Sequence, residues 1–225
     1  VLPAYQGTHY NDGITDCGTV ADSDGNVYQT VVIGDQCWMA ENLKYLPSVV
    51  GPGTGSETIP YYYVYGYNGT DVTAAKATAN YDTYGVLYNW TAAMDGEESS
   101  EANPSGVQGV CPDGWHLPSD AEWTALEDYL IANGYNWDGS TTGDKTGKSL
   151  AAKSGWTYSS TTGSVGNDQQ SNNSTGFTAL PGGYRHYAGY FDNIGIYTHL
   201  WSTAEHSTTS AYFQSMHYNR GDLYR

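Results

Sequence analysis

The cysteines and histidines are the side chains of this chain with the greatest potential for chemistry, and their spacing matches none of the common reactive motifs. The three cysteines, Cys17, Cys37 and Cys111, contain no Cys-x-x-Cys pair. None of the six histidines has the i, i+4 spacing and glutamate partner of a helical zinc motif. The sequence also lacks a Gly-x-Ser-x-Gly nucleophile elbow. We therefore predict that the protein is not an enzyme and has no catalytic residues, metal ligands or cofactor.

Aromatic side chains are the second group that is able to bind a ligand. The chain has 22 tyrosines and 7 tryptophans but only 3 phenylalanines. Tyrosine and tryptophan combine an apolar ring with a polar end, which suits interfaces and sugar-stacking sites. A Tyr- and Trp-rich β core is the competing interpretation, and we favour it for Trp201. The candidate ligand-binding residues all lie in the second half of the chain: Tyr187, Tyr190, Tyr197, His199, His206 and Tyr212.

The charge balance excludes several classes of partner. With 24 acidic and 8 basic residues, the net charge is −16, and the basic surface that nucleic acids require is missing. No segment has the run of about 18 apolar residues needed to cross a membrane. A polar, lysine-poor composition instead fits a mature exported chain, so we predict an extracellular or cell-surface location. An acidic chain is compatible with Ca²⁺, but no specific motif supports a calcium site.

The segment from Asp22 to Asn26 tests the calcium interpretation directly. Its Asp-Gly and Gly-Asn pairs are typical of hairpin turns. A calcium loop needs its glycine at the sixth position, whereas Gly25 stands at the fourth. We therefore predict a hairpin turn here.

The elements that must position these residues are two helices and a series of short strands. Ser119 and Glu122 form a capping-box pattern that predicts a helix over residues 119–133, ended by Gly134. Apolar residues at helical spacing predict a second helix over residues 84–94. Residues 157–174 are rich in Ser, Thr, Gly, Asn and Gln and are predicted to form an exposed loop. Strands are predicted at residues 18–21, 27–33, 38–43, 61–67, 177–180, 183–186, 196–202 and 211–218.

Six motifs in a fixed order carry a resemblance to a known family. They are DGNVY at 24–28, CWMAENL at 37–43, YGVLYNWTAA at 84–93, GVCPDGWHLPSDAEW at 109–123, GFTALPGGYR at 176–185 and WST at 201–203. Together they resemble the Fibrobacter succinogenes major paralogous domain, which is common in secreted and surface proteins of Bacteroidota and Fibrobacterota. This resemblance implies a C-type-lectin-like fold, related to the formylglycine-generating enzymes. The implied fold class is α+β, with two helices, a mostly antiparallel irregular sheet and long loops.

The resemblance also has implications for the cysteines and the chain ends. It implies a Cys17–Cys37 disulfide that brackets the first hairpin. Formylglycine-generating enzymes use a reactive cysteine pair in their C-terminal half, and this chain has no cysteine after Cys111. In the family, a cysteine placed like Cys111 is expected to bond to a cysteine in the last strand. We therefore predict a leader at residues 1–16 and a family domain at 17–225 that lacks its last strand.

Two functions are compatible with this organisation. A domain short of one strand has an open edge that a neighbouring subunit can fill, and head-to-tail repetition of that contact builds a fibre. Residues 2–14 are the candidate donor strand, so the first hypothesis is a secreted, non-enzymatic fibre or surface protomer whose partners are copies of itself. The alternative is an adhesin-like module that binds carbohydrate or protein. Exposed-looking loops also carry two candidate glycosylation sites, Asn68 and Asn173.

Overall fold

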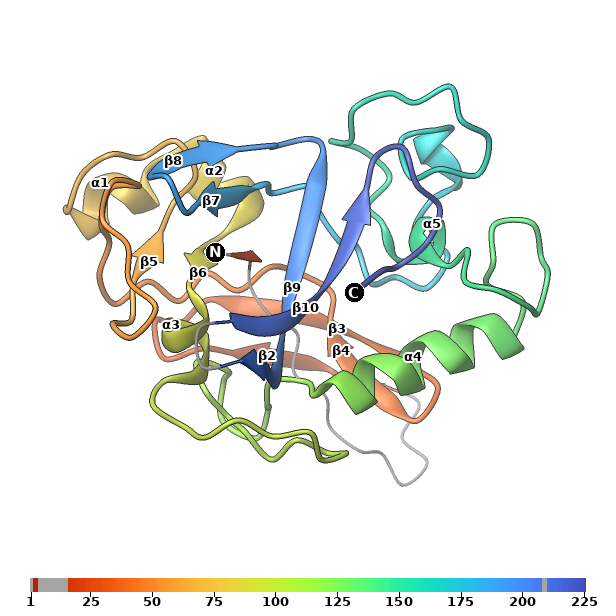
Figure 1. Cartoon of the computed structure of the whole chain (residues 1–225), viewed down its shortest axis with the longest axis horizontal. Helices are drawn as coiled ribbons and strands as arrows, with labels where there is room; N and C mark the ends of the chain where they lie inside the picture. The colour runs from red at the N-terminus through yellow and green to blue at the C-terminus, as the bar shows by residue number, and fades with distance from the viewer. Residues whose placement is uncertain (1, 4–15, 208–209) are drawn as a thin grey trace.

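The longest strands form an antiparallel hairpin that runs through the middle of the molecule (Figure 1). In this hairpin, β9 (Tyr197–Ser207) pairs with β10 (Ser210–His217), and Phe213 lies opposite Trp201. The computed structural model describes Leu2–Pro3 and residues 16–207 and 210–225. The short helices of residues 72–94 and two small sheets lie on one side of the hairpin, and the longest helix, another short helix and several long loops lie on the other.

Three further antiparallel sheets surround the hairpin. The first is a meander of β2, β3 and β4, the second contains β1, β6 and β5 in that order, and the third pairs β7 with β8. The predicted α+β class with mostly antiparallel, irregular sheets is therefore confirmed. The strands of these sheets are β1 (Leu2–Pro3), β2 (Thr19–Ala21), β3 (Val27–Ile33), β4 (Gln36–Met39), β5 (Tyr62–Tyr63), β6 (Leu87–Tyr88), β7 (Tyr184–His186) and β8 (Tyr190–Asp192).

Helix α4 (Asp120–Ala132) begins where the sequence predicts it. The Ser119 side chain accepts a hydrogen bond from the backbone N–H of Glu122, and the Glu122 carboxylate accepts one from the backbone N–H of Ser119. Glu122 is buried and also accepts bonds from the Ser105 N–H and from His116 Nε2, at 3.0 and 2.8 Å. The capping box therefore also attaches the preceding loop to the helix.

The predicted helix over residues 84–94 is wrong. The segment instead contains the end of α2, strand β6 and the short helix α3, because Gly85 and Asn89 divide it. Gly85 has a φ of +69°, and a Cβ there would lie 2.5 Å from the carbonyl oxygen of Leu43. Asn89 then caps α3 through the N–H of Ala92. The remaining helices are α1 (Val72–Lys76), α2 (Ala79–Tyr84), α3 (Trp90–Met94), α5 (Gly147–Leu150) and the 3₁₀ turn η1 (Gln169–Ser171).

Two apolar clusters form the core. One gathers side chains from β6, α3 and the loops around residues 43–49 and 107–117. The other packs α4 against β3, β4 and the central hairpin. Three fully buried rings lie at the centre of the second cluster, where Trp38 contacts Trp123 with ring centroids 4.8 Å apart and Phe177 at 5.7 Å.

Residues 157–174 are mostly loop, as their composition predicts, but only part of the segment is exposed. Val165 and Asn172 are buried, and the Asn172 amide donates to the carbonyls of Ala152 and Val165. Lys148 is buried as well, and its ammonium donates to the carbonyls of Asn167 and Asp168. A single buried cation thus holds the backbone of a polar segment, and burial lowers the pKa of Lys148.

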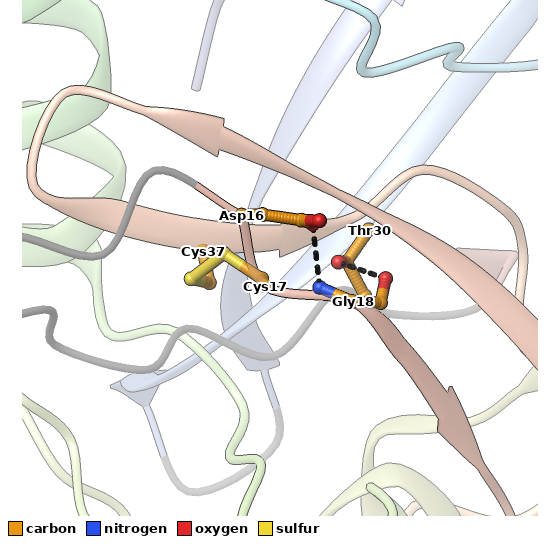
Figure 2. Close-up of a disulfide and its surroundings, with 5 residues drawn as sticks. All are labelled: Asp16, Cys17, Gly18, Thr30 and Cys37. Carbon is orange, nitrogen blue, oxygen red and sulfur yellow. Dashed lines mark hydrogen bonds between the residues drawn. A yellow bond between two sulfur atoms is a disulfide. The ribbon is translucent and has the colours of Figure 1, made fainter.

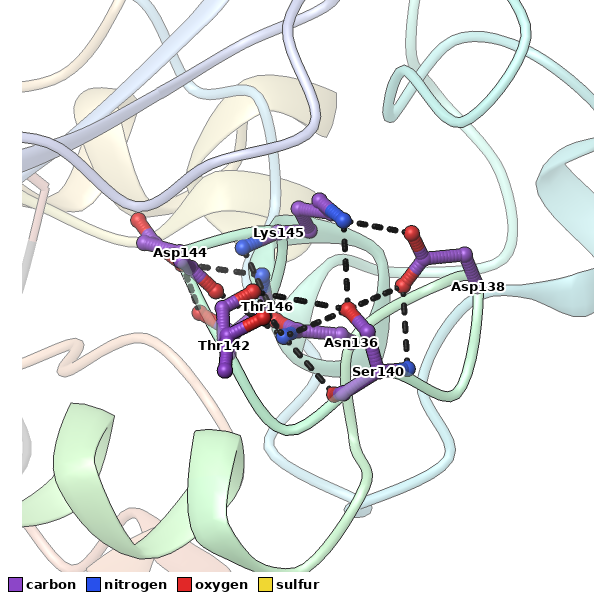
Figure 3. Close-up of polar contacts among 8 residues, drawn as sticks. Asn136, Asp138, Ser140, Thr142, Asp144, Lys145 and Thr146 are labelled. Atoms are coloured by element: carbon purple, nitrogen blue, oxygen red, sulfur yellow. Dashed lines mark hydrogen bonds and ion pairs between the residues drawn. The ribbon is translucent and has the colours of Figure 1, made fainter.

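The loop that follows α4 is also internally hydrogen-bonded (Figure 3). The Asn136 amide nitrogen donates to the carbonyls of Ser140 and Gly143, and its oxygen accepts from the N–H of Lys145. The Lys145 ammonium pairs with Asp138 at 2.5 Å. Amide, hydroxyl and ammonium groups of the loop itself thus bond to its carbonyls and to the Asp138 carboxylate.

The first hairpin is closed by a disulfide and by a turn built around one carboxylate. Cys17 and Cys37 are bonded, with Cα atoms 6.1 Å apart, as the family resemblance implies (Figure 2). At the predicted turn, the buried Asp22 carboxylate accepts bonds from the N–H groups of Asp24 and Asn26 and from the Tyr28 hydroxyl. The hairpin turn at Asp22–Asn26 is therefore confirmed.

Candidate functional site

The first strand lies next to β6, β7 and β9. β1 runs antiparallel to β6, with Leu2 opposite Tyr88 and Pro3 opposite Leu87. β5 pairs with the other side of β6, and β1 also lies against β7 and β9. Proline lacks a backbone N–H and is tolerated at sheet edges, which fits the edge position of β1. Most of the predicted leader, residues 4–15, lies outside the described residues.

A groove lies next to the end of β6. Asn89, the residue after Tyr88, forms part of its lining, and the groove has a volume of about 490 Å³. Volumes of about 300–1,000 Å³ are usual for small-molecule sites. The groove lies between the loop at residues 56–58, the start of α3 and the end of the central hairpin. Its lining includes three aromatic and three charged residues: Trp90, Trp201, Tyr187, Arg185, Glu57 and Glu205.

Two tryptophans are held in place by hydrogen bonds that cross between their elements. Trp90 Nε1 donates to the carbonyl of Ser202 at 2.9 Å, and Trp201 Nε1 donates to the carbonyl of Tyr88 at 3.0 Å. Both rings are partly buried and pack against the first core cluster. Because both N–H groups are used within the protein, each indole offers a ligand mainly its ring surface.

Asn89 fixes the wall of the groove opposite the hairpin. Its side-chain oxygen accepts from the N–H groups of Tyr61 and Ala92, and its nitrogen donates to the carbonyls of Ser56 and Ile59. Burial of this amide costs little free energy because all these hydrogen bonds are formed, and the bonds rigidify the backbone around it. Asn89 is therefore a structural residue that positions the loop next to Trp90.

Arg185 supplies a fixed positive charge at the groove. Its Nε donates to the carbonyl of Pro52 at 2.8 Å, and its guanidinium lies 5.7 Å from the ring centre of Tyr63. A Cβ at Gly55 would meet the guanidinium nitrogens at 2.5 and 2.7 Å, so the loop packs directly on this group. Among the described residues, no carboxylate forms an ion pair with Arg185.

Four of the six predicted ligand-binding residues are linked by ring contacts. The His186 ring lies between Tyr187 and Tyr190, with ring centroids at 4.2 and 4.6 Å, and it contacts Tyr184, which in turn contacts Tyr197 and His199. Of the six, Tyr187 lines the groove and is 88% exposed. His206 and Tyr212 lie at a neighbouring hollow of about 240 Å³, where Arg225 covers the Tyr212 ring.

Tyr197 and His199 belong to an aromatic cluster beside the central hairpin. Their rings stack with centroids 5.2 Å apart, and His199 also contacts Tyr184 and Phe213. The Nδ1 atom of His199 is hydrogen-bonded to the buried hydroxyl of Ser215. Burial lowers the pKa of His199 from 6.5 to about 3, so this histidine stays neutral where an exposed one gains a proton.

The two candidate glycosylation sites differ in their surroundings. Asn68 is exposed. Asn173 has a φ of +61°, and its amide nitrogen donates to the Thr178 hydroxyl at 2.8 Å. Attachment of a sugar to that nitrogen would compete with this bond, so Asn68 is the better-placed candidate.

Cys111 is a buried free thiol in the first core cluster. Its burial, together with the nearby Glu97 carboxylate, raises the pKa of the thiol well above its usual value. A thiol in this state is a poor nucleophile. The partner that the family resemblance implies for a cysteine at this position has no counterpart in the sequence, which contains no cysteine after Cys111.

Sequence reasoning did not single out Trp90, Arg185, Glu57 or Glu205 as site residues. No local signal marks them, because they come from four separate segments. Trp201 packs against the first core cluster, as we predicted. It also lines the groove.

The fold and the groove define an α+β protein with an aromatic surface cleft. Among the described residues, no group of His, Cys, Asp or Glu is arranged to hold a metal ion, and no helix is long and apolar enough to span a bilayer. The family model of the Fibrobacter succinogenes major domain matches residues 31–225. The chain therefore belongs to this family. No curated protein and no solved structure matches it.

Proposed function

We propose that this protein is a non-enzymatic structural protomer that assembles end to end by exchange of its first strand. The observation that supports this proposal is the pairing of β1 with β6, in which Leu2 lies opposite Tyr88 and Pro3 opposite Leu87. Main-chain hydrogen bonds are the usual source of affinity when a strand is added to a sheet edge. The same main-chain groups of β1 are suited to pair with the β6 of a second copy.

The length of the connection allows this exchange. Twelve residues, 4–15, connect β1 to Asp16. An extended chain spans at most about 3.3–3.6 Å per residue, so twelve residues reach up to about 40 Å. A connection of this length allows β1 to reach the β6 strand of a molecule that lies next to its own. The contact is heterologous and does not close on itself, so it leads to a fibre.

Electrostatic repulsion opposes this assembly. Every copy carries a net charge of −16, and repulsion between copies weakens as salt shortens the screening length to about 10 Å at 0.1 M. Assembly driven by backbone pairing and apolar contact is therefore expected to increase with ionic strength. An assembly held by ion pairs between subunits would respond in the opposite way.

The location that best fits this role is extracellular or on the cell surface. The Cys17–Cys37 disulfide supports an oxidising compartment, because such bonds are rare in the reducing cytosol. An acidic surface with few lysines is consistent with solubility there. Asn68 is the residue at which an exported form would carry a glycan.

The test is electron microscopy and light scattering of the full chain, refolded at high concentration and at increasing salt. We expect uniform fibres that become more abundant with salt. A variant lacking residues 1–15 should stay monomeric and should bind a synthetic peptide of residues 1–15, whereas a scrambled peptide of the same composition should not bind. If the full chain stays monomeric at every concentration and salt level, strand exchange is refuted.

A further inference from the structure

We propose that the groove at the end of β6 binds a neutral saccharide chain, which packs on Trp90, Trp201 and Tyr187. This inference goes beyond assembly, because it concerns a ligand other than a second copy of the chain. It does not depend on strand exchange and can be tested on the monomer as well as on the fibre.

The floor of the groove is suited to the apolar face of a sugar ring. The two indole N–H groups donate to backbone carbonyls of Ser202 and Tyr88, so the rings cannot rotate freely and their surfaces remain for stacking. Tyr187 adds a third ring that is 88% exposed. Large aromatic surfaces with a few fixed polar groups are typical of small-molecule sites.

The polar groups at the groove favour a ligand that both donates and accepts hydrogen bonds. Arg185 offers only donors, whereas Glu57 and Glu205, both exposed, offer only acceptors when ionised. A sugar hydroxyl satisfies both kinds of group without carrying charge.

The same charges disfavour an anionic ligand, which meets the two carboxylates and the field of a protein with a net charge of −16. A cationic ligand is attracted by that field but meets the guanidinium of Arg185, which is held in place by the carbonyl of Pro52. A neutral polyhydroxylated chain can bond to the carboxylates and to the guanidinium at the same time, and a cationic peptide is the competing ligand in the test.

The test is isothermal titration calorimetry of the full chain with cello-, xylo-, manno- and chito-oligosaccharides. We expect at least one of them to bind, with an affinity that changes little between low and high salt, because a neutral ligand has no charge to screen. Tyr187→Ala should weaken that binding about tenfold through loss of a stacking ring. The matched control is Tyr158→Ala, which removes a tyrosine that is 74% exposed and does not line the groove.

A second pair of variants examines the polar contacts. Glu205→Gln should weaken binding several-fold, whereas Glu98→Gln, an exposed glutamate outside the groove lining, should leave it unchanged. The proposal is overturned if none of the four oligosaccharides binds at millimolar concentration. It is equally overturned if the Tyr158→Ala control loses as much affinity as Tyr187→Ala, or if a lysine-rich peptide binds and no sugar does.

Discussion

Acid is expected to destabilise this protein through His199. The ring is enclosed by Tyr184, Tyr197 and Phe213, and its Nδ1 atom is bonded to Ser215, a hydroxyl inside the fold. Its pKa is about 3 in the folded chain, against an ordinary value of 6.5. Because the folded pKa lies below the unfolded one, the unfolded chain takes up a proton first as the pH falls. The contribution of the neutral ring to the free energy of unfolding is present above pH 6.5 and is lost as the pH falls from 6.5 to 3.

The size of the effect follows from these two pKa values. Over the interval from about pH 7 to about pH 4.5, linkage gives a loss of about 2.5 kcal/mol of unfolding free energy from this one group. The ring keeps some contact with solvent, so this is an upper value. A domain with a typical stability of about 5–15 kcal/mol would lose a substantial fraction of it.

The measurement is urea unfolding followed by tryptophan fluorescence at both pH values. The variant His199→Asn keeps an amide that can bond to Ser215 but has no group that titrates in this range. The free energy of unfolding of this variant should therefore fall less on acidification than that of the wild type. The difference between the two proteins should be at most about 2.5 kcal/mol. His206→Asn removes an exposed histidine from the same strand and serves as the control.

Other groups titrate in the same range, but they cancel in this comparison. Burial and the nearby Asp144, Asp128 and Asp222 raise the pKa of Glu127 to about 7, so this group favours the folded state as the pH falls. Wild type and variant share that contribution. The reasoning is refuted if the two proteins lose equal stability on acidification, or if His206→Asn changes the pH dependence as much as His199→Asn does.

Three further predictions concern stability and the cysteines. Replacing Glu122 by Ala should cost about 3–5 kcal/mol in urea unfolding, because the buried carboxylate accepts two backbone N–H bonds and contacts a histidine; a loss below about 1 kcal/mol would contradict this. Replacing Cys17 and Cys37 by Ser should cost about 3 kcal/mol, the loop-closure entropy of a bridge spanning 20 residues, and unchanged thermal unfolding would argue against it. Cys111 should react with a thiol reagent only in denaturant, since it is buried; rapid labelling of the native protein would contradict its position in the core.

Elements with local signals were predictable from the sequence. Strand β3 has the predicted bounds Val27–Ile33, and α4 begins at the predicted capping box of Ser119 and Glu122. Both depend on side chains within a few residues of each other. The Cys17–Cys37 bond was not visible in the residues themselves and came from the family resemblance.

Where prediction from the sequence failed, tertiary contacts outweighed composition. The pattern at residues 84–94 predicted one helix, but Gly85 approaches the carbonyl of Leu43 too closely for any other residue. The polar segment 157–174 was predicted to be exposed, yet Lys148 and Asn172 supply the hydrogen bonds that allow part of it to be buried. Lys148 lies outside the polar segment, and Asn172 bonds to Ala152, which also lies outside it, so the composition of the segment alone does not record these contacts.

The sequence by itself determined the family, the α+β class, the capped helix and the acidic, tyrosine-rich character, because order and composition carry that information directly. Only the tertiary structure decided which aromatic rings meet. It linked four of the six predicted ligand-binding residues by ring contacts, joined Tyr187 to Trp90 and Trp201 at one groove, and packed His199 within the hairpin cluster. The physical reason is that these contacts join segments that are far apart in the chain and are selected by how the two core clusters pack, which no local pattern records.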